Sequence, residues 1–221
     1  MRNRRMLRGA RAHDDAEEGF SILEVLITMV VFGIAMGIVT HAVVKVQTYA
    51  RDVQVSADAN GEARLALADI DRQVRSGNVL YSPANETSPS TCTAVGTDAG
   101  TCMRVYTQAN GFERCVQWQL IADPVKPSTQ QLRSRSWSPT WQTDGKFSDW
   151  SIKARNLNAA TTSPFTLQGA ATPSSSRYLV VYVEANDPRR PGKPVQLTSS
   201  LAGRNTNYGY DAGLCSPAPP A

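Results

Sequence analysis

The sequence predicts an α+β protein in which a long N-terminal helix, transmembrane and then amphipathic, packs on an antiparallel β-sheet head. Proline is absent from the first 82 residues, whereas all thirteen prolines, all four tryptophans and all four cysteines lie at Pro83 or beyond. Proline-free periodic segments favour helix, and short apolar runs separated by turn residues favour strands. The chain of 221 residues therefore divides near residue 77 into a helical stalk and a turn-rich head.

Composition excludes several functional classes. The chain is 41% hydrophobic and carries a mild net charge of +4, so its charge does not require a nucleic-acid partner. Its only histidines are His13 and His41, which argues against a His-based metal site or catalytic triad. We expect no cofactor and no metal.

Residues 1–19 place five arginines before four acidic residues. One interpretation is a cytoplasmic tail whose arginines orient the next segment. The other is a leader that is removed. A secretory signal is cut after its apolar core, but Lys45–Tyr49 is a poor site of that kind. Cleavage, if it occurs, should therefore fall before the apolar run, at Gly19.

The apolar run, Val25–Val44, contains twenty residues without a formal charge. At about 1.5 Å per residue it is roughly 30 Å long, the thickness of a bilayer's hydrocarbon core. We expect a transmembrane helix over 20–46, with the arginines in the cytoplasm and the head outside. Glu24 lies at the edge of this run, where a carboxylate either reaches headgroup water or needs a positive partner.

The junction Gly19-Phe20, the acid at Glu24 and the apolar run behind a basic leader resemble the cleavage and methylation signature of type IV pilins and their relatives. The resemblance implies that a prepilin peptidase cuts between Gly19 and Phe20 and methylates the new amino group of Phe20. It implies that Glu24 meets the amino terminus of a neighbouring subunit during assembly. It also implies a precursor in the inner membrane, an assembly platform and other pilin subunits as partners, and a final place in a filament at the cell surface or in the periplasm.

Gly33 and Gly37 lie four residues apart on one face of the predicted transmembrane helix. Small residues at this spacing let a second helix approach closely. The alternative is that they are ordinary glycines, which are common in membrane spans.

Residues 47–76 predict the amphipathic half of the same helix. Gly61 should weaken it by about 1 kcal/mol relative to alanine, and Gly77 is a plausible stop. A coiled coil would require a cleaner heptad, so packing on a sheet of the same chain is preferred. The apolar stripe consists of Val46, Tyr49, Ala50, Val53, Ala57, Ala63, Leu67, Ile70 and Val74.

The head, 77–221, contains no long helical pattern, so its sheet should be antiparallel. Asn110-Gly111 predicts a two-residue hairpin turn between the first two strands. The head also resembles that of pilin-like proteins, and the segments Trp150–Asn156 and Arg204-Asn205 look like PilW-like minor pilins and J-type pseudopilins of type II secretion. The expected strands are Met103–Thr107, Phe112–Ile121, Leu132–Trp137, Phe147–Arg155, Tyr178–Ala185 and Val195–Leu201.

The four cysteines, in a compartment where disulfides persist, allow three pairings. We favour Cys92–Cys102, which closes a Ser/Thr/Gly-rich loop, and Cys115–Cys215, which ties the proline-rich tail to the sheet. Cys102 and Cys115 are not opposite each other in the predicted hairpin, which disfavours that pair.

Aromatic and basic residues of the head leave a binding role open. Trp118 and Trp150 lie within strands and should be core, whereas Trp141 is in a polar loop and is the candidate ligand contact. The basic clusters are solvated loop faces or a DNA-binding surface. They consist of Arg133 with Arg135, and of Arg189 and Arg190 with Lys193.

The favoured function is a structural subunit, a minor pilin or pseudopilin, for a type IV pilus or a type II secretion-like filament. The alternative is a filament-tip module that binds DNA or a surface. A membrane-anchored enzyme ranks last, because no nucleophile elbow, phosphate-binding loop or recognisable pair of catalytic acids occurs.

Overall fold

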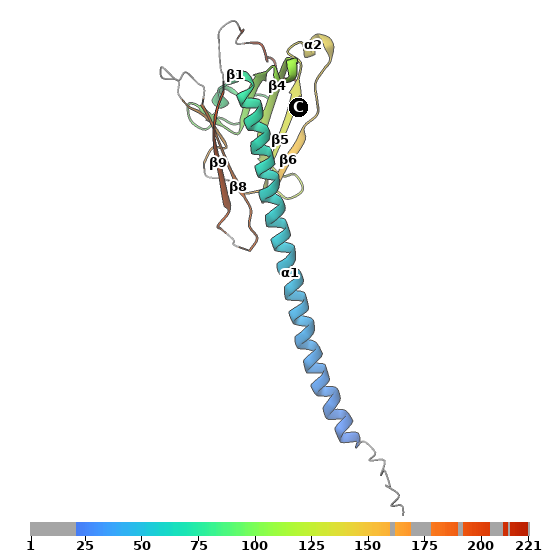
Figure 1. The fold of residues 1–221 in the computed structure, drawn as a ribbon. Coiled ribbons are helices and arrows are strands. Elements are labelled where there is room, and N and C mark those ends of the chain that lie inside the picture. Colours follow the sequence, from blue (N-terminus) through green and yellow to red (C-terminus); the bar gives the residue numbers. More distant parts are fainter. Residues whose placement is uncertain are drawn as a thin grey trace, which may run out of the picture. The chain divides into compact units, whose positions relative to one another are not determined.

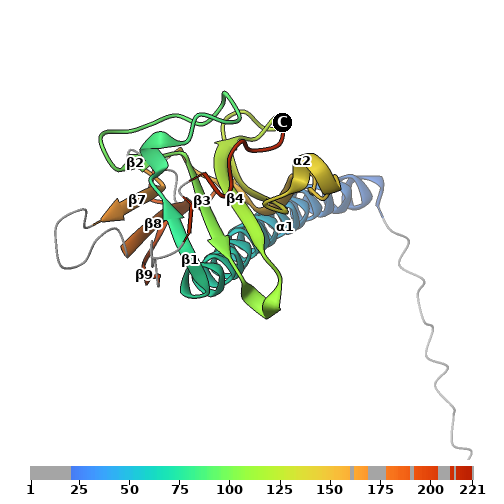
Figure 2. The same cartoon turned by 90° about the horizontal axis from the view of Figure 1, so that it is seen from above.

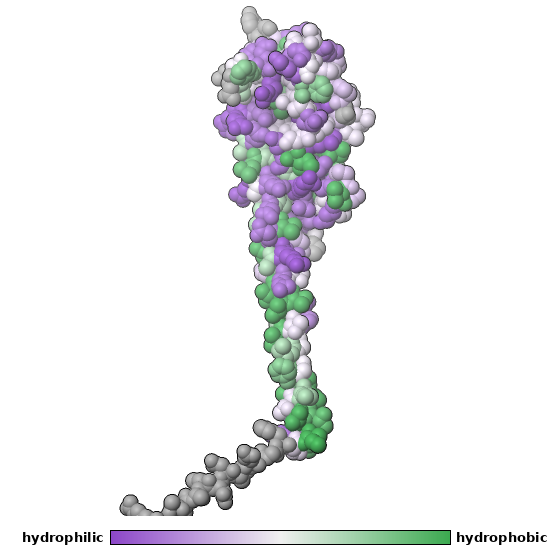
Figure 3. Space-filling model, turned by 90° about the vertical axis from the view of Figure 1, so that its right-hand side faces the viewer, coloured by the Kyte–Doolittle hydropathy of each residue, from purple (hydrophilic) through white to green (hydrophobic). Residues whose placement is uncertain are grey.

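The computed structural model describes residues 21–159, 162–168, 178–189, 192–203, 210–211 and 213–220. The chain forms two units, Met1–Thr48 and Tyr49–Ala221, and helix α1 (Ile22–Arg75) contributes residues to both. In the first unit, α1 is exposed along its whole described length. Figure 3 shows the apolar side chains that surround this half of the helix. The second unit contains the rest of α1 and the sheet.

The second half of α1 packs on the sheet through a row of small residues. Successive members are three or four residues apart, which places them on one helix face, and their small side chains let the backbone approach the strands. The observed face differs from the predicted stripe, because Tyr49, Ala50 and Ala57 of that stripe are exposed. Ala59 and Ala66, which were not in the stripe, are buried instead. The buried residues are Ser56, Ala59, Ala63, Ala66, Ile70 and Val74.

Helix α1 ends at Arg75, one residue before the predicted end at Ser76. The Ser76 hydroxyl donates to the Arg72 carbonyl oxygen at 2.9 Å and satisfies one of the last carbonyls of the helix. Gly77 instead begins the first strand, where an added Cβ would lie 2.7 Å from Cγ2 of Val105. A glycine is needed here because α1 and the strand that follows approach the next strand too closely for a side chain.

All strand pairs are antiparallel, and the sheet order is β1-β3-β4-β5-β6-β8-β7-β2, with β9 also pairing with β8. Strands β5 and β6 lie behind α1, and β8 and β9 lie to its left (Figure 1). Seen from above, β7, β8 and β9 turn away from β3 and β4, so the sheet is curled (Figure 2). The strands are β1 (Gly77–Tyr81), β2 (Ala99–Gly100), β3 (Cys102–Thr107), β4 (Arg114–Ala122), β5 (Gln130–Trp137), β6 (Ser151–Leu157), β7 (Phe165–Gln168), β8 (Tyr178–Ala185) and β9 (Val195–Ala202).

The α+β class and the six predicted strand regions are confirmed, but the predicted two-residue hairpin is wrong. Strand β3 ends at Thr107 and β4 begins at Arg114, directly opposite it. The Thr107 hydroxyl accepts a hydrogen bond from the Ala109 backbone N–H at 3.2 Å, which diverts the chain into the short 3-10 helix η2 (Ala109–Gly111). The loop therefore has six residues, and Gly111 supplies a positive φ of 76°.

The start of strand β6 also differs from the prediction. The strand predicted from Phe147 begins only at Ser151. Phe147 forms a single bridge with Trp137, and the short helix α2 (Trp141–Asp144) precedes it. The 3-10 helix η1 (Pro83–Asn85) and the strands β1, β2 and β7 were not predicted.

The head has a hydrophobic core on each face of the sheet. The larger core lies between α1 and the sheet and contains Ile70, Val105, Trp118 and Leu132 together with side chains from β6 to β9. The smaller core lies on the opposite face and consists of Val79, Tyr106, Cys115, Trp137 and Cys215. Both faces of the central strands are therefore buried.

Candidate functional site

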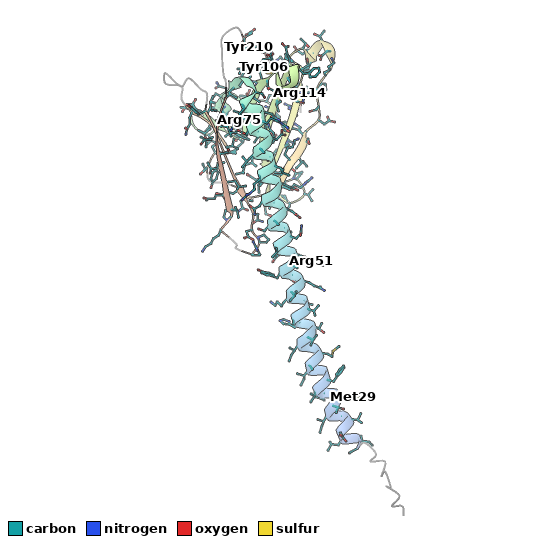
Figure 4. The ribbon with its side chains drawn as sticks, viewed as in Figure 1. Met29, Arg51, Arg75, Tyr106, Arg114 and Tyr210 are labelled. Carbon is teal, nitrogen blue, oxygen red and sulfur yellow. A yellow bond between two sulfur atoms is a disulfide. The ribbon has the colours of Figure 1, made fainter. Side chains whose placement is uncertain are left out.

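The apolar half of α1 is the most unusual surface of the described chain. Its large hydrophobic residues from Ile22 to Tyr49 are all at least 40% exposed, and Ile22 is 82% exposed. Met29, labelled in Figure 4, projects outward from the helix. α1 is the one helix of the described residues that is long and apolar enough to cross a membrane, with a mean hydropathy of 2.5 in its most apolar stretch. Such a surface needs lipid or other apolar helices around it.

The threonine hydroxyls in this half of α1 are satisfied within the helix. The hydroxyls of Thr28, Thr40 and Thr48 donate to the carbonyl oxygens of Val25, Met36 and Val44 at 2.8–3.0 Å. A hydroxyl that is bonded to its own helix can enter an apolar environment at low cost. The apolar half of α1 is thus suited to burial in lipid despite its three threonines.

Glu24, unlike these threonines, carries a charge. It carries the single formal charge of the stretch Ile22–Val44 and lies in the first turn of α1, where the helix dipole favours a negative charge. Its side chain is exposed, and none of the described residues forms an ion pair with it. The predicted cleavage and methylation residues, Gly19 and Phe20, lie outside the described residues.

Gly33 and Gly37 both lie within α1, and an added Cβ at either would have no neighbour within 4 Å. Neither glycine is thus required by packing inside this chain. They leave a narrow region of the exposed helix without side chains, which is open to a second helix.

The head contains the two disulfides favoured from the sequence. Cys92 is joined to Cys102 and Cys115 to Cys215, with Cα–Cα distances of 5.4 and 5.7 Å. The second bond attaches the C-terminal tail to β4. The aromatic ring of Tyr210 in this tail lies 5.4 Å from that of Tyr106 in β3. Figure 4 labels both residues at the end of the head.

The tail covers a charged network on the sheet face opposite α1. Glu86 forms an ion pair with Arg104 at 3.0 Å and accepts a hydrogen bond from the Gln117 amide at 3.0 Å. Arg104 also donates to the Cys215 carbonyl oxygen at 2.8 Å. Glu86 is only 3% exposed, and its burial raises its pKa, although Arg104 and Gln117 oppose this shift. Sequence reasoning did not identify this network.

Arg135 is 3% exposed and Arg133 is half-buried, and both take part in the packing of the head. Their guanidinium groups stack on the Trp150 ring at 4.3 and 4.6 Å from its centre. Arg135 donates to the side-chain oxygen of Gln117 and to the Pro220 carbonyl oxygen. Burial and the neighbouring Arg133 lower the pKa of Arg135 to about 10, while Glu86 raises it. Arg135 is thus part of the packing under the tail and not a solvated loop residue.

Two other candidate ligand contacts, Trp141 and Arg189, also have partners within the chain. The Trp141 indole donates to the Pro217 carbonyl oxygen at 2.9 Å and meets the Phe147 ring edge-on, so it holds the tail. Arg189 forms an ion pair with Asp187 at 3.0 Å, and this contact lowers the pKa of Asp187. Lys193 is exposed. Arg190, Arg204 and Asn205 lie outside the described residues.

Shallow depressions lie on the described surface around Arg114, which Figure 4 labels. One of about 490 Å³ is lined by Phe112, Arg114, Trp137 and Phe147 among others. Another of about 490 Å³ lies between Arg72, Arg114 and Thr107. Within the described ranges no three His, Cys, Asp or Glu side chains gather in a group that could hold a metal ion.

Comparison with known families agrees with the exposed apolar helix. Residues 15–40 match the model of the prokaryotic N-terminal methylation motif. No curated protein and no solved structure matches the chain. The motif and the long apolar helix packed on a curled antiparallel sheet support a type IV pilin-like family.

These two features support a pilin- or pseudopilin-like subunit with a membrane-anchored precursor. The motif implies processing by prepilin peptidase and assembly with other subunits.

Proposed function

We propose that this chain is a minor pilin or pseudopilin, cut between Gly19 and Phe20 by prepilin peptidase and methylated at Phe20. The observation that carries the proposal is the apolar half of α1, exposed throughout and interrupted by one acid. Before assembly this segment crosses the inner membrane with the leader 1–19 inside and the head outside. During assembly 20–46 moves from lipid into a bundle of similar helices.

Glu24 acts in this step through its charge. Cleavage creates an ammonium group on Phe20, four residues from Glu24 in the sequence. Each charge alone is costly in an apolar layer, whereas an ammonium and a carboxylate in contact compensate one another. The carboxylate of one subunit pairs with the amino terminus of its neighbour, and the pair selects the correct axial register. Gly33 and Gly37 allow the two helices to approach closely.

The proposed role as a minor subunit, and the PilW-like or J-type subgroup, rest on the resemblance of the segment Trp150–Asn156 to PilW-like minor pilins and J-type pseudopilins. In the structure this segment includes the Trp150 ring that receives Arg133 and Arg135. Quantitative mass spectrometry of sheared filaments tests the minor role. A minor subunit is present at far below one copy per copy of the main subunit, and equal abundance contradicts this assignment.

Mass spectrometry of the mature amino terminus tests the processing step. Protein from cells with the peptidase should begin with N-methylphenylalanine at Phe20, and protein from cells without it should retain residues 1–19. A Gly19→Leu variant should also retain the leader, whereas the exposed head variant Lys193→Gln should be processed normally. A functional filament subunit that still begins with Met1 would contradict the proposal.

A further inference from the structure

Strand β9 is a long and regular edge of the sheet. All eight of its residues, from Val195 to Ala202, pair with β8 without a register shift. Among the described residues β9 has no second strand partner. The backbone N–H and C=O groups that point away from β8 can therefore receive another strand.

Proteins usually protect such an edge with charged residues, proline or a bulge. β9 has the sequence Val-Gln-Leu-Thr-Ser-Ser-Leu-Ala and contains none of these. The four other strands of at least seven residues, β4, β5, β6 and β8, each contain a charged residue. The lack of protection is thus particular to β9 among the long strands.

Strand β6 shows how this protein protects a partly open edge. β6 pairs with β8 at Leu157 alone, so its earlier residues have only β5 as a described strand partner. Lys153 and Arg155 lie on this strand, and its pairing with β5 is irregular. The Arg155 backbone N–H donates to the Glu62 carboxylate of α1 at 2.8 Å. β9 has no comparable feature among the described residues.

The side chains of β9 define the segment that would fit beside it. Val195 and Leu197 pack against the main core, and Leu201 is 3% exposed. The alternate residues Gln196, Thr198 and Ser200 face solvent. An added strand with apolar residues on one side and uncharged polar residues on the other would extend both faces.

A second copy of this chain fits the edge poorly because of direction. Arg189, just before β9, lies 3.4 Å from the Ser56 hydroxyl of α1, and Gly203, just after β9, lies beside the Val74 carbonyl. α1 and β9 thus run in the same direction within the head. Two copies joined through antiparallel β9 strands would direct their helices oppositely, which membrane anchoring in one bilayer forbids.

The size of the β9 edge also disfavours a second folded copy as the partner. Eight residues at about 3.4 Å each form a strip about 27 Å long and one strand spacing, about 4.8 Å, wide. Stable interfaces between folded subunits bury about 800 Å² per partner, far more than this strip offers. An extended peptide can instead use its whole length for main-chain hydrogen bonds and side-chain contacts.

We propose that β9 is a docking edge for an extended, uncharged segment of a different polypeptide, which adds to the sheet as an antiparallel strand. The exclusion of a second copy rests on the membrane anchoring in the proposed function. The partner segment alternates apolar and small polar residues, like β9 itself.

The test uses the full chain in detergent micelles and a fluorescein-labelled peptide of eight alternating valines and threonines. Fluorescence anisotropy should show saturable binding that empty micelles do not give. The double variant T198K/S200K, which adds charges at the exposed edge, should weaken binding at least about tenfold. The control variant Gln168→Lys adds a charge to β7, and it should bind like the unmodified chain. A peptide with proline in place of two valines should not bind.

Hydrogen exchange gives a second readout. The peptide should slow amide exchange in 195–202 of the unmodified chain and leave exchange in β6 unchanged. Equal binding by T198K/S200K, no saturable binding, or a β9-dependent dimer in light scattering would overturn the proposal. None of these measurements depends on cleavage at Gly19, so failure here is distinguishable from failure of the proposed function.

Discussion

The indole N–H of Trp118 donates a 2.7 Å hydrogen bond to the side-chain oxygen of Gln73, which joins the centre of β4 to α1. The Trp118 side chain is completely buried, so its N–H depends on this acceptor. The contact face of α1 consists mainly of small residues, which offer little interdigitation with the sheet. This hydrogen bond therefore helps to fix α1 along its axis.

Replacement of Gln73 by leucine should destabilise the head by about 1–3 kcal/mol, because the buried Trp118 N–H loses its acceptor. Chemical denaturation of the full chain in micelles, followed by tryptophan fluorescence, measures this loss. Gln54→Leu is the matched control, since Gln54 is exposed and bonds to the exposed Asp58 of the same helix. This variant should change stability by less than about 0.5 kcal/mol. Equal effects of the two variants would contradict the role given to Gln73.

Two glycine-to-alanine substitutions should change the stability of the head in opposite directions. At Gly77 the new Cβ would lie 2.7 Å from Val105, so we expect a loss of about 1–3 kcal/mol from overpacking. At Gly61 in α1 nothing lies within 4 Å, so alanine should stabilise by about 1 kcal/mol through its higher helix propensity. Thermal unfolding of both variants, monitored by circular dichroism, provides the comparison. A stabilising Gly77→Ala would exclude the close approach of β1 and β3.

The two disulfides should contribute unequally. They close segments with sequence separations of 10 and 100 residues. In the chain-entropy model these loops correspond to about 2.7 and about 4.7 kcal/mol. Replacement of Cys115 and Cys215 by serine should therefore lower the denaturation midpoint more than replacement of Cys92 and Cys102. The reverse order would show that the tail contributes little to the folded head.

Glu86 should make the stability of the head depend on pH. Its pKa in the folded head is raised above the ordinary value of 4.5, mainly by burial, so the folded state binds the proton more tightly than the unfolded state. Stability should fall as pH rises from 4.5 through the raised pKa of Glu86, and then level off. Glu86→Gln should remove this decline, while Glu113→Gln, at an exposed position, should retain it. An equal decline of stability with pH in the unmodified chain, Glu86→Gln and Glu113→Gln would contradict the assignment of this pH dependence to Glu86.

Glu24→Ala should leave cleavage after Gly19 largely intact and impair assembly, because the amino terminus of Phe20 would enter the filament without a partner. Mass spectrometry reads out cleavage, and immunoblots of sheared filaments read out incorporation. Glu24→Asp, which keeps the charge on a shorter side chain, should recover part of the incorporation. Normal incorporation of Glu24→Ala would remove the role proposed for this acid.

Local sequence patterns predicted the helix and the longer strands. Val25–Val44 is continuously apolar, and the strand regions of β4, β5 and β8 are long enough for their residue types to be decisive. β2 and β7 have only two and four residues, too few for a periodic signal. The buried face of α1 differs from the predicted stripe because alanines occur on more than one side of the helix. Ala57 is exposed, whereas Ala59 and Ala66 face the sheet.

The network under the tail could not be predicted, because it depends on strand register and on a distant segment. Gln117 and Gln119 lie directly opposite Arg135 and Arg133 across β4 and β5. From the sequence, these alternating polar residues indicate a solvent-exposed sheet face. The C-terminal tail covers that face, and only the Cys115–Cys215 pair indicated that it would return there.

The Cys115–Cys215 bond encloses β4 to β9 in one covalent ring. A protease that cuts once inside this ring, for example in the loop between β4 and β5, would leave the two pieces joined. Nicked heads would thus stay attached to their anchor and migrate as intact protein on a gel until a reductant is added. In the filament proposed above, this linkage would keep a nicked subunit joined to its neighbours.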